Sequence, residues 1–383
     1  MTDKQTFDFV IIGAGMAGAS AAYFLSAEGS VLLLEMEAQP GYHTTGRSAA
    51  LFSEAYGNAP IRALTTGGRA FLMEPPDGFT ETPILSPRGA LFVGREDQLA
   101  ALDEAYADGA ENLDTMQRLT ASEARNLVPV LREDYVAAGV LEPRAMDMDV
   151  NALHQGFLSG ARRNGMQLRS NARVEQLRRA GDSWLVRAGG DGIAAKIVIN
   201  AAGAWCDEVA DLAGARRVGL MPKRRTAVLF DGPKGHDFPH WPMFIDVDEE
   251  FYVRPESGAL MGSPADETPM EPCDVQPDEL DIAIAVDRLQ KATTLQIGRI
   301  IRSWAGLRSF VADKTPVVGF DPEVDGFFWL AGQGGYGIQT APSMGRVAAA
   351  LAVGNEIPGD LQDFGVRAGD LSPVRFNREG GEP

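Results

Sequence analysis

The sequence has 383 residues, 45% of them hydrophobic, which is enough for two medium-sized domains with buried cores. It carries 53 Asp and Glu against 35 Lys and Arg, a net charge of −18. Because phosphate contacts need clustered Lys and Arg, this charge argues against nucleic acids and anionic membranes as partners. The two cysteines, Cys206 and Cys273, cannot build a disulfide framework, which favours a cytoplasmic protein. No stretch of sequence approaches the roughly 20 apolar residues of a membrane span.

The first predicted element is a buried parallel strand at residues 7–12, which is short and ends at Gly13. A helix follows from about residue 16, and a second buried strand at residues 31–34 ends at Glu35. In this strand–turn–helix setting the glycines match the dinucleotide fingerprint, with Glu35 placed to accept the ribose hydroxyls. The fingerprint residues are Gly13, Ala14, Gly15, Met16, Ala17 and Gly18.

Further along the chain, apolar periodicity predicts alternating strands and helices. The predicted strands lie at residues 84–85, 90–93, 167–169, 184–186, 197–199, 228–230, 251–253, 259–261 and 327–330. The predicted helices lie at residues 97–107, 122–127 and 151–164, from residue 277 onward, and at residues 338–353.

These elements predict an α/β protein with a Rossmann-type nucleotide-binding domain built from discontinuous segments. Those segments are residues 1–50, 140–215 and 305–375. The antiparallel stretches between them, residues 51–139 and 216–304, predict an α+β substrate-binding domain. Residues 376–383 are expected to form a tail.

Three small-residue segments, at residues 41–50, 200–205 and 333–337, can approach a long cofactor. Because they are spread along the whole chain, they favour FAD over NAD. Beyond the fingerprint and Glu35, the expected cofactor-binding residues are Met36, Gly46, Arg47, Ser48, Ala49, Ala50, Val174, Ala202, Gly203, Trp205, Gly306, Gly334, Tyr336, Gly337, Ile338 and Thr340.

Six segments together resemble the D-amino-acid oxidase and glycine oxidase superfamily of FAD-dependent oxidoreductases, and within it the D-arginine dehydrogenases. These segments are residues 41–50 (GYHTTGRSAA), 152–156, 200–207, 222–225, 304–310 and 333–340. The resemblance implies oxidation of an α-amino acid to an imino acid by hydride transfer from the α-carbon to flavin N5. Water then converts the imino acid to a keto acid and ammonia.

The resemblance also implies a clamp for the substrate carboxylate. Arg308 matches the superfamily's clamp, and its planar guanidinium can donate two parallel hydrogen bonds to a carboxylate. Arg225 and Tyr252 are expected to assist, and Tyr56 to sit on a loop that covers the site. Gly335 and Gln339 are expected where the last glycine turn meets substrate and flavin.

Two departures from the arginine enzymes predict the substrate. Ala90 stands where a glutamate would meet a guanidinium, and Leu51 stands where a histidine is expected. With Ser53, Met243 and Ile245 in the same pocket, the side-chain end becomes apolar, and an unpaired guanidinium would be costly there. The sequence therefore predicts a neutral D-amino acid with a hydrophobic or small side chain.

Several alternatives stay open at this stage. The enzyme can instead oxidise sarcosine, glycine or cyclic secondary amino acids, and the chain can be a non-catalytic flavin-binding protein or an NAD-linked dehydrogenase. The electron acceptor is a quinone or dioxygen, and a quinone would place the protein at the membrane periphery.

Other polar residues are assigned structural roles. Neither cysteine suits a covalent link, so FAD is expected to bind non-covalently. His43 and His154 are expected to pack around the cofactor loop and a helix, and no metal site is expected. The acidic run at residues 246–250 is interpreted as a solvated turn.

Overall fold

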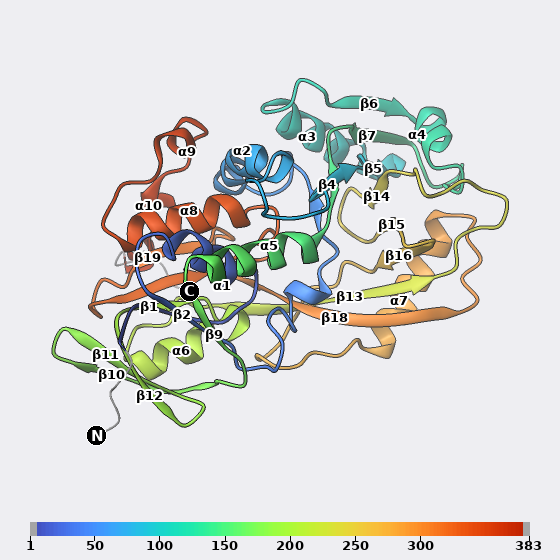
Figure 1. Cartoon of the computed structure of the whole chain (residues 1–383). Coiled ribbons are helices and arrows are strands. Elements are labelled where there is room, and N and C mark those ends of the chain that lie inside the picture. Colours follow the sequence, from blue (N-terminus) through green and yellow to red (C-terminus); the bar gives the residue numbers. More distant parts are fainter. Residues whose placement is uncertain (1–5, 378–383) are drawn as a thin grey trace.

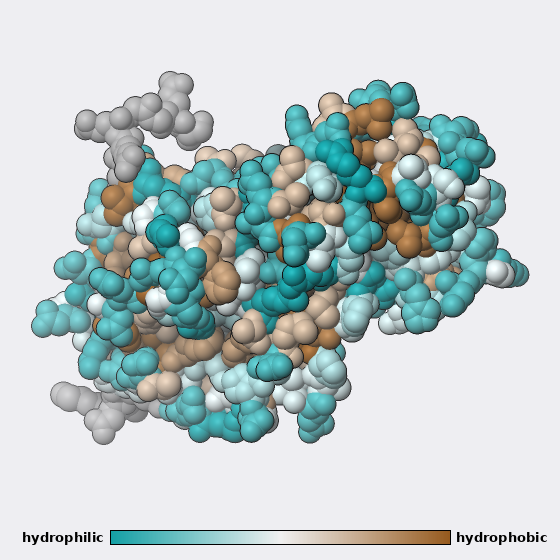
Figure 2. Space-filling model, turned by 90° about the horizontal axis from the view of Figure 1, so that it is seen from above, coloured by the Kyte–Doolittle hydropathy of each residue, from teal (hydrophilic) through white to brown (hydrophobic). Residues whose placement is uncertain are grey.

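The structure is a computed structural model that describes residues 6–377 (Figure 1). Most of the tail predicted at residues 376–383 lies outside the described residues. The chain forms an eight-stranded sheet and a nine-stranded sheet, with a three-stranded sheet in addition. The space-filling view shows a predominantly hydrophilic face on which hydrophobic residues appear in small groups (Figure 2).

The eight-stranded sheet is built around β1 (Thr6–Ile12), which pairs in parallel with β2 (Val31–Leu34) and β12 (Asp191–Asn200). Phe9 and Ile11 belong to one buried cluster, and Val10 and Ile12 belong to another. A strand buried on both faces must be apolar at every position, which is why this segment lacks the alternation of a half-exposed strand.

Further strands complete this sheet on both sides. β9 (Gln167–Arg169) pairs in parallel with β2, and β20 (Phe327–Ala331) pairs in parallel with β12. The antiparallel strands β10 (Val174–Ala180) and β11 (Ser183–Ala188) pair beside β12. β19 (Val317–Phe320) pairs antiparallel with β20.

Helices from distant parts of the chain cover this sheet. α1 (Met16–Leu25) packs against α5 (Val150–Arg163) and α8 (Ala341–Ala352), so the first and last parts of the chain lie side by side (Figure 1). α6 (Cys206–Ala213) packs beside β10. The helix predicted from residue 338 begins only at Ala341, because Pro342 in the first turn sets its start and residues 336–340 form hydrogen-bonded turns.

The nine-stranded sheet has the order β17-β13-β16-β15-β14-β5-β7-β6, with β18 on the other side of β13. Its strands are β5 (Ala90–Gly94), β6 (Gln117–Thr120), β7 (Ala138–Glu142), β13 (Met221–Phe230), β14 (Met243–Asp246), β15 (Tyr252–Glu256), β16 (Ala259–Ser263), β17 (Thr268–Pro269) and β18 (Ile300–Phe310). The sheet is antiparallel except for β5 and β14, which run parallel. The expected antiparallel sheet is confirmed apart from this one pair, which a long crossover connects.

The remaining elements connect and cover the sheets. The three-stranded sheet consists of β3 (Leu51–Phe52), β8 (Met146–Met148) and β4 (Leu85–Pro87). The other helices are α2 (Ala59–Met73), α3 (Leu99–Ala110), α4 (Ala121–Leu127), α7 (Glu279–Ala292), α9 (Gly359–Asp363) and α10 (Ala368–Leu371). Within residues 6–377, every helix is too short or too polar to cross a membrane.

The fold class predicted from the sequence is confirmed: a Rossmann-type parallel sheet with helices stands beside a largely antiparallel sheet. The domain limits remain a prediction. β7 and β18 pair within the nine-stranded sheet, although residues 140–142 and 305–310 fall in the segments predicted for the cofactor domain. The long β13–β18 pair links the two regions and carries residues of the site described next (Figure 1).

Candidate functional site

One cavity extends from the glycine turn after β1 to the nine-stranded sheet. Gly13, Gly15 and Glu35 line its first end, while Arg225 and Arg308 line its second. The cavity therefore joins the predicted cofactor and substrate regions.

The turn after β1 has room only for glycine. Gly13 has φ = 101°, and a Cβ on it would lie 2.4 Å from the Ala201 carbonyl oxygen. A Cβ on Gly18 would lie 1.8 Å from the Gly13 carbonyl oxygen. The first glycine thus permits the turn, and the third permits close packing of α1 on β1, as the fingerprint predicts.

Glu35 is held rigidly at the end of β2. Its Oε2 accepts a hydrogen bond from the Ala14 N–H at 2.9 Å, and its Oε1 accepts one from the Glu37 N–H at 3.0 Å. Each carboxylate oxygen can accept a second hydrogen bond. Because Glu35 also lines the cavity, its carboxylate fits the role of accepting ribose hydroxyls.

Gly203, in the second small-residue segment, and Gly306, on β18, leave space beside the backbone. Gly203 lines the cavity and has φ = 58°. Apart from the two adjacent residues, no atom of the described residues lies within 4 Å of the position that a Cβ on Gly203 would take. A Cβ on Gly306 would lie 3.6 Å from the Cβ of Arg47. Such open backbone fits a long, flat group such as FAD, laid across the strand ends.

Arg47 ties the cofactor loop to β18 and its surroundings. Its Nη1 donates to the carbonyl oxygens of Val275 and Ala305, and its own carbonyl oxygen accepts a hydrogen bond from the Trp304 Nε1. Its Nη2 pairs with Asp274. These contacts fix the loop around Arg47 against β18 and the segment at residues 274–275.

Most of the expected cofactor-binding residues line the cavity. They are Gly13, Gly15, Met16, Ala17, Glu35, Met36, Arg47, Ser48, Ala49, Ala50, Val174, Ala202, Gly203, Trp205, Gly306, Gly334, Gly337 and Ile338.

Ala14, Gly18, Gly46, Tyr336 and Thr340 lie behind the cavity wall among the described residues. Ala14 is engaged through its backbone with Glu35 and His154, and the Thr340 hydroxyl donates to the Tyr336 carbonyl oxygen. A Cβ on Gly46 would lie 2.7 Å from the Gly41 carbonyl oxygen. These five residues shape the cavity wall from outside.

Arg308 on β18 dominates the second end. Its Nη2 donates to the Tyr56 hydroxyl at 2.8 Å, while its Nη1 is buried without a hydrogen-bond partner among the described residues. Nη1 lies 3.6 Å from Oε1 of Glu267. Burial disfavours the charge, but Tyr56, Glu249 and Tyr252 outweigh it and raise the pKa of Arg308 above its ordinary value. Arg308 is thus a largely buried cation whose Nη1 has the Glu267 carboxylate at ion-pair distance but no hydrogen-bond partner among the described residues.

Glu267 shares its carboxylate among three cations. Its Oε2 lies 2.8 Å from Lys223 Nζ, and its Oε1 lies 3.2 Å from Arg225 Nη2. Although burial alone would raise it, the pKa of Glu267 is lowered by Lys223 and by the charges of Arg308 and Arg225. Glu267 and Glu249 supply two negative charges against the three cations, which leaves the cluster with capacity for one further anion.

Gly335 makes room for the Arg308 guanidinium. A Cβ on Gly335 would lie 1.7 Å from Nη2 and 2.3 Å from Cζ of Arg308. The Tyr252 ring lies 6.0 Å from the Arg225 guanidinium carbon. The structure therefore brings the predicted clamp residues Arg308, Arg225 and Tyr252 together with Tyr56 and Gly335, and all five line the cavity.

The predicted side-chain pocket forms another part of the wall. Leu51, Ala90, Met243 and Ile245 line the cavity, and Phe92 joins them. β5 and β14 place Ala90 beside Met243, and Phe92 beside Ile245, in parallel register. This wall is apolar.

Ser53 and Gln339 connect the apolar wall to the glycine turn. The Ser53 N–H donates to Gln339 Oε1 at 3.2 Å, and Gln339 Nε2 donates to the Thr65 hydroxyl at 2.9 Å. Both Ser53 and Gln339 line the cavity. Their hydrogen bonds fix the segment after β3 against the turn before α8.

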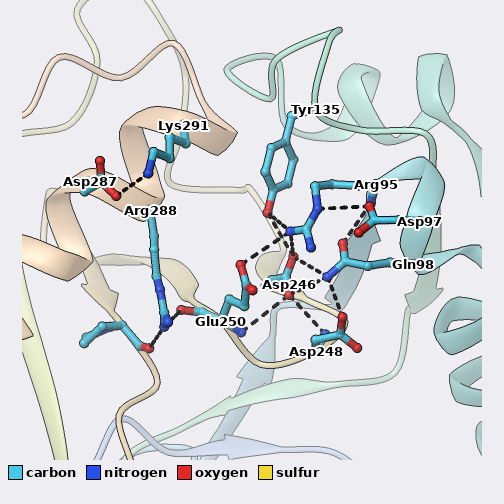
Figure 3. A network of polar contacts seen from close by, with 11 residues as sticks. Arg95, Asp97, Gln98, Tyr135, Asp246, Asp248, Glu250, Asp287, Arg288 and Lys291 are labelled. Carbon is cyan, nitrogen blue, oxygen red and sulfur yellow. Dashed lines mark hydrogen bonds and ion pairs between the residues drawn. The ribbon is translucent and has the colours of Figure 1, made fainter.

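The acidic run at residues 246–250 forms the expected turn, with Asp248 and Glu249 exposed, but its first residue is not solvated. Asp246 is fully buried and accepts hydrogen bonds from Gln98 Nε2 and the Tyr135 hydroxyl, with Arg95 nearby (Figure 3). Burial raises the pKa of Asp246. This network fixes the β14–β15 turn.

The same turn presents Glu249 to the cavity. Glu249 has φ = 55°, an uncommon conformation outside glycine, and lines the cavity between Ile245 and Tyr252. Sequence reasoning missed Glu249 because a run of acids is typical of exposed turns. Its place in a short hairpin between two expected pocket residues was the available signal.

The histidines and cysteines have structural partners. His154 Nε2 lies 2.9 Å from the Ala14 carbonyl oxygen, and His43 Nε2 lies 2.9 Å from Glu37 Oε1. Cys206 is fully buried, and within the described part of the chain neither it nor Cys273 lines the cavity. Residues 6–377 contain no group of three or more His, Cys, Asp or Glu that could hold a metal ion.

A double-mutant cycle tests the contact between Gly335 and Arg308. We expect Gly335→Ala to lower the free energy of unfolding by about 1–3 kcal/mol, since its Cβ would overlap the guanidinium. In an Arg308→Ala background the same change should cost much less, because the overlapping atoms are gone. Denaturant titrations of the four proteins measure this. An equal cost in both backgrounds would show that the two residues are not coupled.

Comparisons with known proteins identify the family. The family model described as "FAD dependent oxidoreductase" (DAO) matches residues 8–351. The oxidoreductase YurR of Bacillus subtilis (strain 168), whose function is uncharacterized, is 25% identical over 374 residues, covering 93% of this chain and 97% of its own.

Solved structures show the same fold. Glycine oxidase from Geobacillus kaustophilus superposes with a TM-score of 0.82 at 22% identity, covering 98% of this chain and 100% of its own. L-proline dehydrogenase from P. horikoshii superposes with a TM-score of 0.82 at 20% identity, covering 99% and 100%. With a family match over most of its length and a cavity shaped for the cofactor, the chain belongs to the DAO family of FAD-dependent oxidoreductases.

Proposed function

We propose that this FAD-dependent oxidoreductase deaminates a neutral D-amino acid with a hydrophobic or small side chain. The observation that carries the proposal is the buried Arg308 guanidinium, which lines the cavity with one donor unpartnered among the described residues. A buried charged donor is costly unless a ligand satisfies it, and a carboxylate matches its planar fork.

The residues of this chain bind and orient the substrate. Arg308, with Arg225 and Tyr252, holds the carboxylate, and the Tyr56 hydroxyl keeps the Arg308 fork in place. Fixing the carboxylate at one end and the side chain at the apolar wall leaves the α-carbon between them. Bound FAD supplies the hydride acceptor, N5 of the flavin. The imino acid product is then hydrolysed by water to a keto acid and ammonia.

The apolar wall supports a neutral side chain. Leu51, Ala90, Met243 and Ile245 offer no charged partner to a guanidinium or ammonium group. Glu249 also lines the cavity, but its charge acts on Arg308, which places it near the carboxylate end. The D configuration rests on the resemblance of the six sequence segments to D-amino-acid enzymes.

A second candidate is the oxidation of secondary amines or glycine. This candidate is supported by the structural similarity to the proteins named glycine oxidase and L-proline dehydrogenase. The clamp serves both candidates, because sarcosine, glycine and proline also carry a carboxylate. The proposals differ in the space available around the nitrogen and the side chain.

Non-covalent binding of FAD belongs to the same proposal. Within the described residues the cavity wall contains no cysteine, and the cavity residue His43 is engaged with Glu37 and packs on Trp205 at 4.7 Å. We propose that a quinone or dioxygen is the electron acceptor and that the protein is cytoplasmic. If the acceptor is a quinone, we expect the protein at the membrane periphery.

Removal of the clamp arginine tests its role. We expect Arg308→Ala to lower kcat/KM by a factor of about 10² or more, since truncating one partner of a buried charge pair costs about 2–5 kcal/mol. Arg346→Ala is the matched control, because Arg346 pairs with Asp360 outside the cavity. Steady-state kinetics on both variants measure the effect. A loss smaller than tenfold for Arg308→Ala would remove this residue from the clamp.

A substrate screen tests the apolar wall. We expect D-Leu, D-Met, D-Phe or D-Pro to reduce the flavin faster than D-Arg and D-Lys, because a buried cation against this wall lacks a partner. Anaerobic bleaching of the flavin absorbance follows each reaction, with L-amino acids and sarcosine in the same series. A clear preference for D-Arg and D-Lys would overturn the neutral substrate, and bleaching by sarcosine alone would establish the second candidate.

A further inference from the structure

A buried carboxylate stands directly behind the cavity wall. Glu142, at the end of β7, is 1% exposed, and its Oε2 accepts a hydrogen bond from the Ser53 hydroxyl at 2.6 Å. Ser53 lines the cavity, whereas Glu142 is not among the described residues that line it. Ser53 therefore connects the cavity to a carboxylate that the clamp and the apolar wall do not use.

The Ser53–Glu142 pair lies between the two ends of the substrate region. Glu142 is the direct cross-strand partner of Ala90, so both side chains lie on the face of the sheet that forms the apolar wall. Through its N–H, Ser53 is also bonded to Gln339 beside the glycine turn that packs on Arg308. In an α-amino acid the amine is attached to the carbon between carboxylate and side chain. The Ser53 hydroxyl thus lies between the carboxylate clamp and the apolar wall, the region in which we expect the substrate amine.

The surroundings of Glu142 are compatible with both of its charge states. β5 presents uncharged Ala90, and the segment after β3 presents Ser53 and the N–H of Glu54, which donates to Oε1 at 3.0 Å. The nearby charged groups are the Glu54 carboxylate and Arg69 of α2, which pair with each other at 2.5 Å. Burial, which outweighs the hydrogen bonds from Ser53 and Glu54, raises the pKa of Glu142 to about 7. Glu142 therefore changes charge near neutral pH.

We propose that Glu142, acting through the Ser53 hydroxyl, accepts the proton that the substrate ammonium must lose before its α-C–H bond can break. The ammonium N–H bond breaks, its electron pair stays on nitrogen, and the proton goes to Ser53 Oγ. The Ser53 hydroxyl proton passes to Glu142 Oε2, which becomes a neutral carboxylic acid. This inference rests on the proposed function, since it requires an amine substrate. Ser53 is the group that touches the substrate, and Glu142 acts through it.

The test is the pH dependence of anaerobic flavin reduction by the best neutral D-amino acid. In the unaltered holoenzyme the rate should fall as pH drops through about 7, because a protonated Glu142 cannot accept a proton. Glu142→Gln should abolish this inflection and slow reduction about a hundredfold or more at pH 7. The rate should then rise only at the higher pH at which the free substrate amine loses its own proton. Ser53→Ala, which keeps the carboxyl group, should act in the same direction.

Glu54→Gln is the matched control, because it removes a carboxylate from the same loop and leaves the Ser53–Glu142 bond in place. Since the Glu54 charge raises the pKa of Glu142, the inflection should persist and move to lower pH. Infrared difference spectra give a readout without turnover: a protonated carboxyl band should titrate near pH 7 and be absent in Glu142→Gln. An unchanged inflection in both Glu142→Gln and Ser53→Ala would overturn the inference. Failure of every amine to bleach the unaltered enzyme would instead overturn the proposed function.

Discussion

The guanidinium of Arg308 is buried in the wall of the cavity and keeps its positive charge. Removing a cation from water costs several kcal/mol unless hydrogen bonds and opposite charges compensate. The surrounding chain supplies this compensation in parts: Tyr56 accepts one hydrogen bond, and Glu267 lies at ion-pair distance. Gly335 supplies the space, because any side chain there would overlap the guanidinium. The donor left over gives a carboxylate a reason to bind at this point.

The β13–β18 pair connects this clamp to the cofactor region. In its register Arg225 lies opposite Gly306, and Lys223 lies opposite Arg308. Gly306 and Arg225 both line the cavity, so one pair of opposed positions holds an open backbone for the cofactor and a cation for the substrate. A rigid ladder fixes such groups more closely than a loop can, which is the requirement for holding a reacting carbon against a cofactor.

Features that depend on residues close together in the sequence were predictable. The strand, glycine turn and helix that begin at Thr6, with Glu35 at the end of β2, follow from local steric rules. Gly13 has a positive φ, and a Cβ on Gly18 would overlap the Gly13 carbonyl oxygen. The apolar lining at Leu51 and Ala90 was likewise visible, because the resemblance marked both positions.

Features that depend on pairing between distant segments were not predictable. Glu142 gains its place only because β7 pairs with β5 and sets it beside Ala90. Asp246 is buried because Gln98 and Tyr135, from other parts of the chain, satisfy it. The parallel β5–β14 pair has no local signal either, since register and direction are decided when the whole sheet forms.

The most direct test of the clamp as the centre of the site compares two substrates that differ only in the carboxylate. Anaerobic flavin reduction is measured with the best neutral D-amino acid and with the amine that its decarboxylation would give. If Arg308 anchors the substrate, the amino acid bleaches the flavin and the amine does so at least about a hundredfold more slowly at equal concentration. Equal rates for the two would contradict the account, because the buried guanidinium would then have no part in placing the reacting carbon.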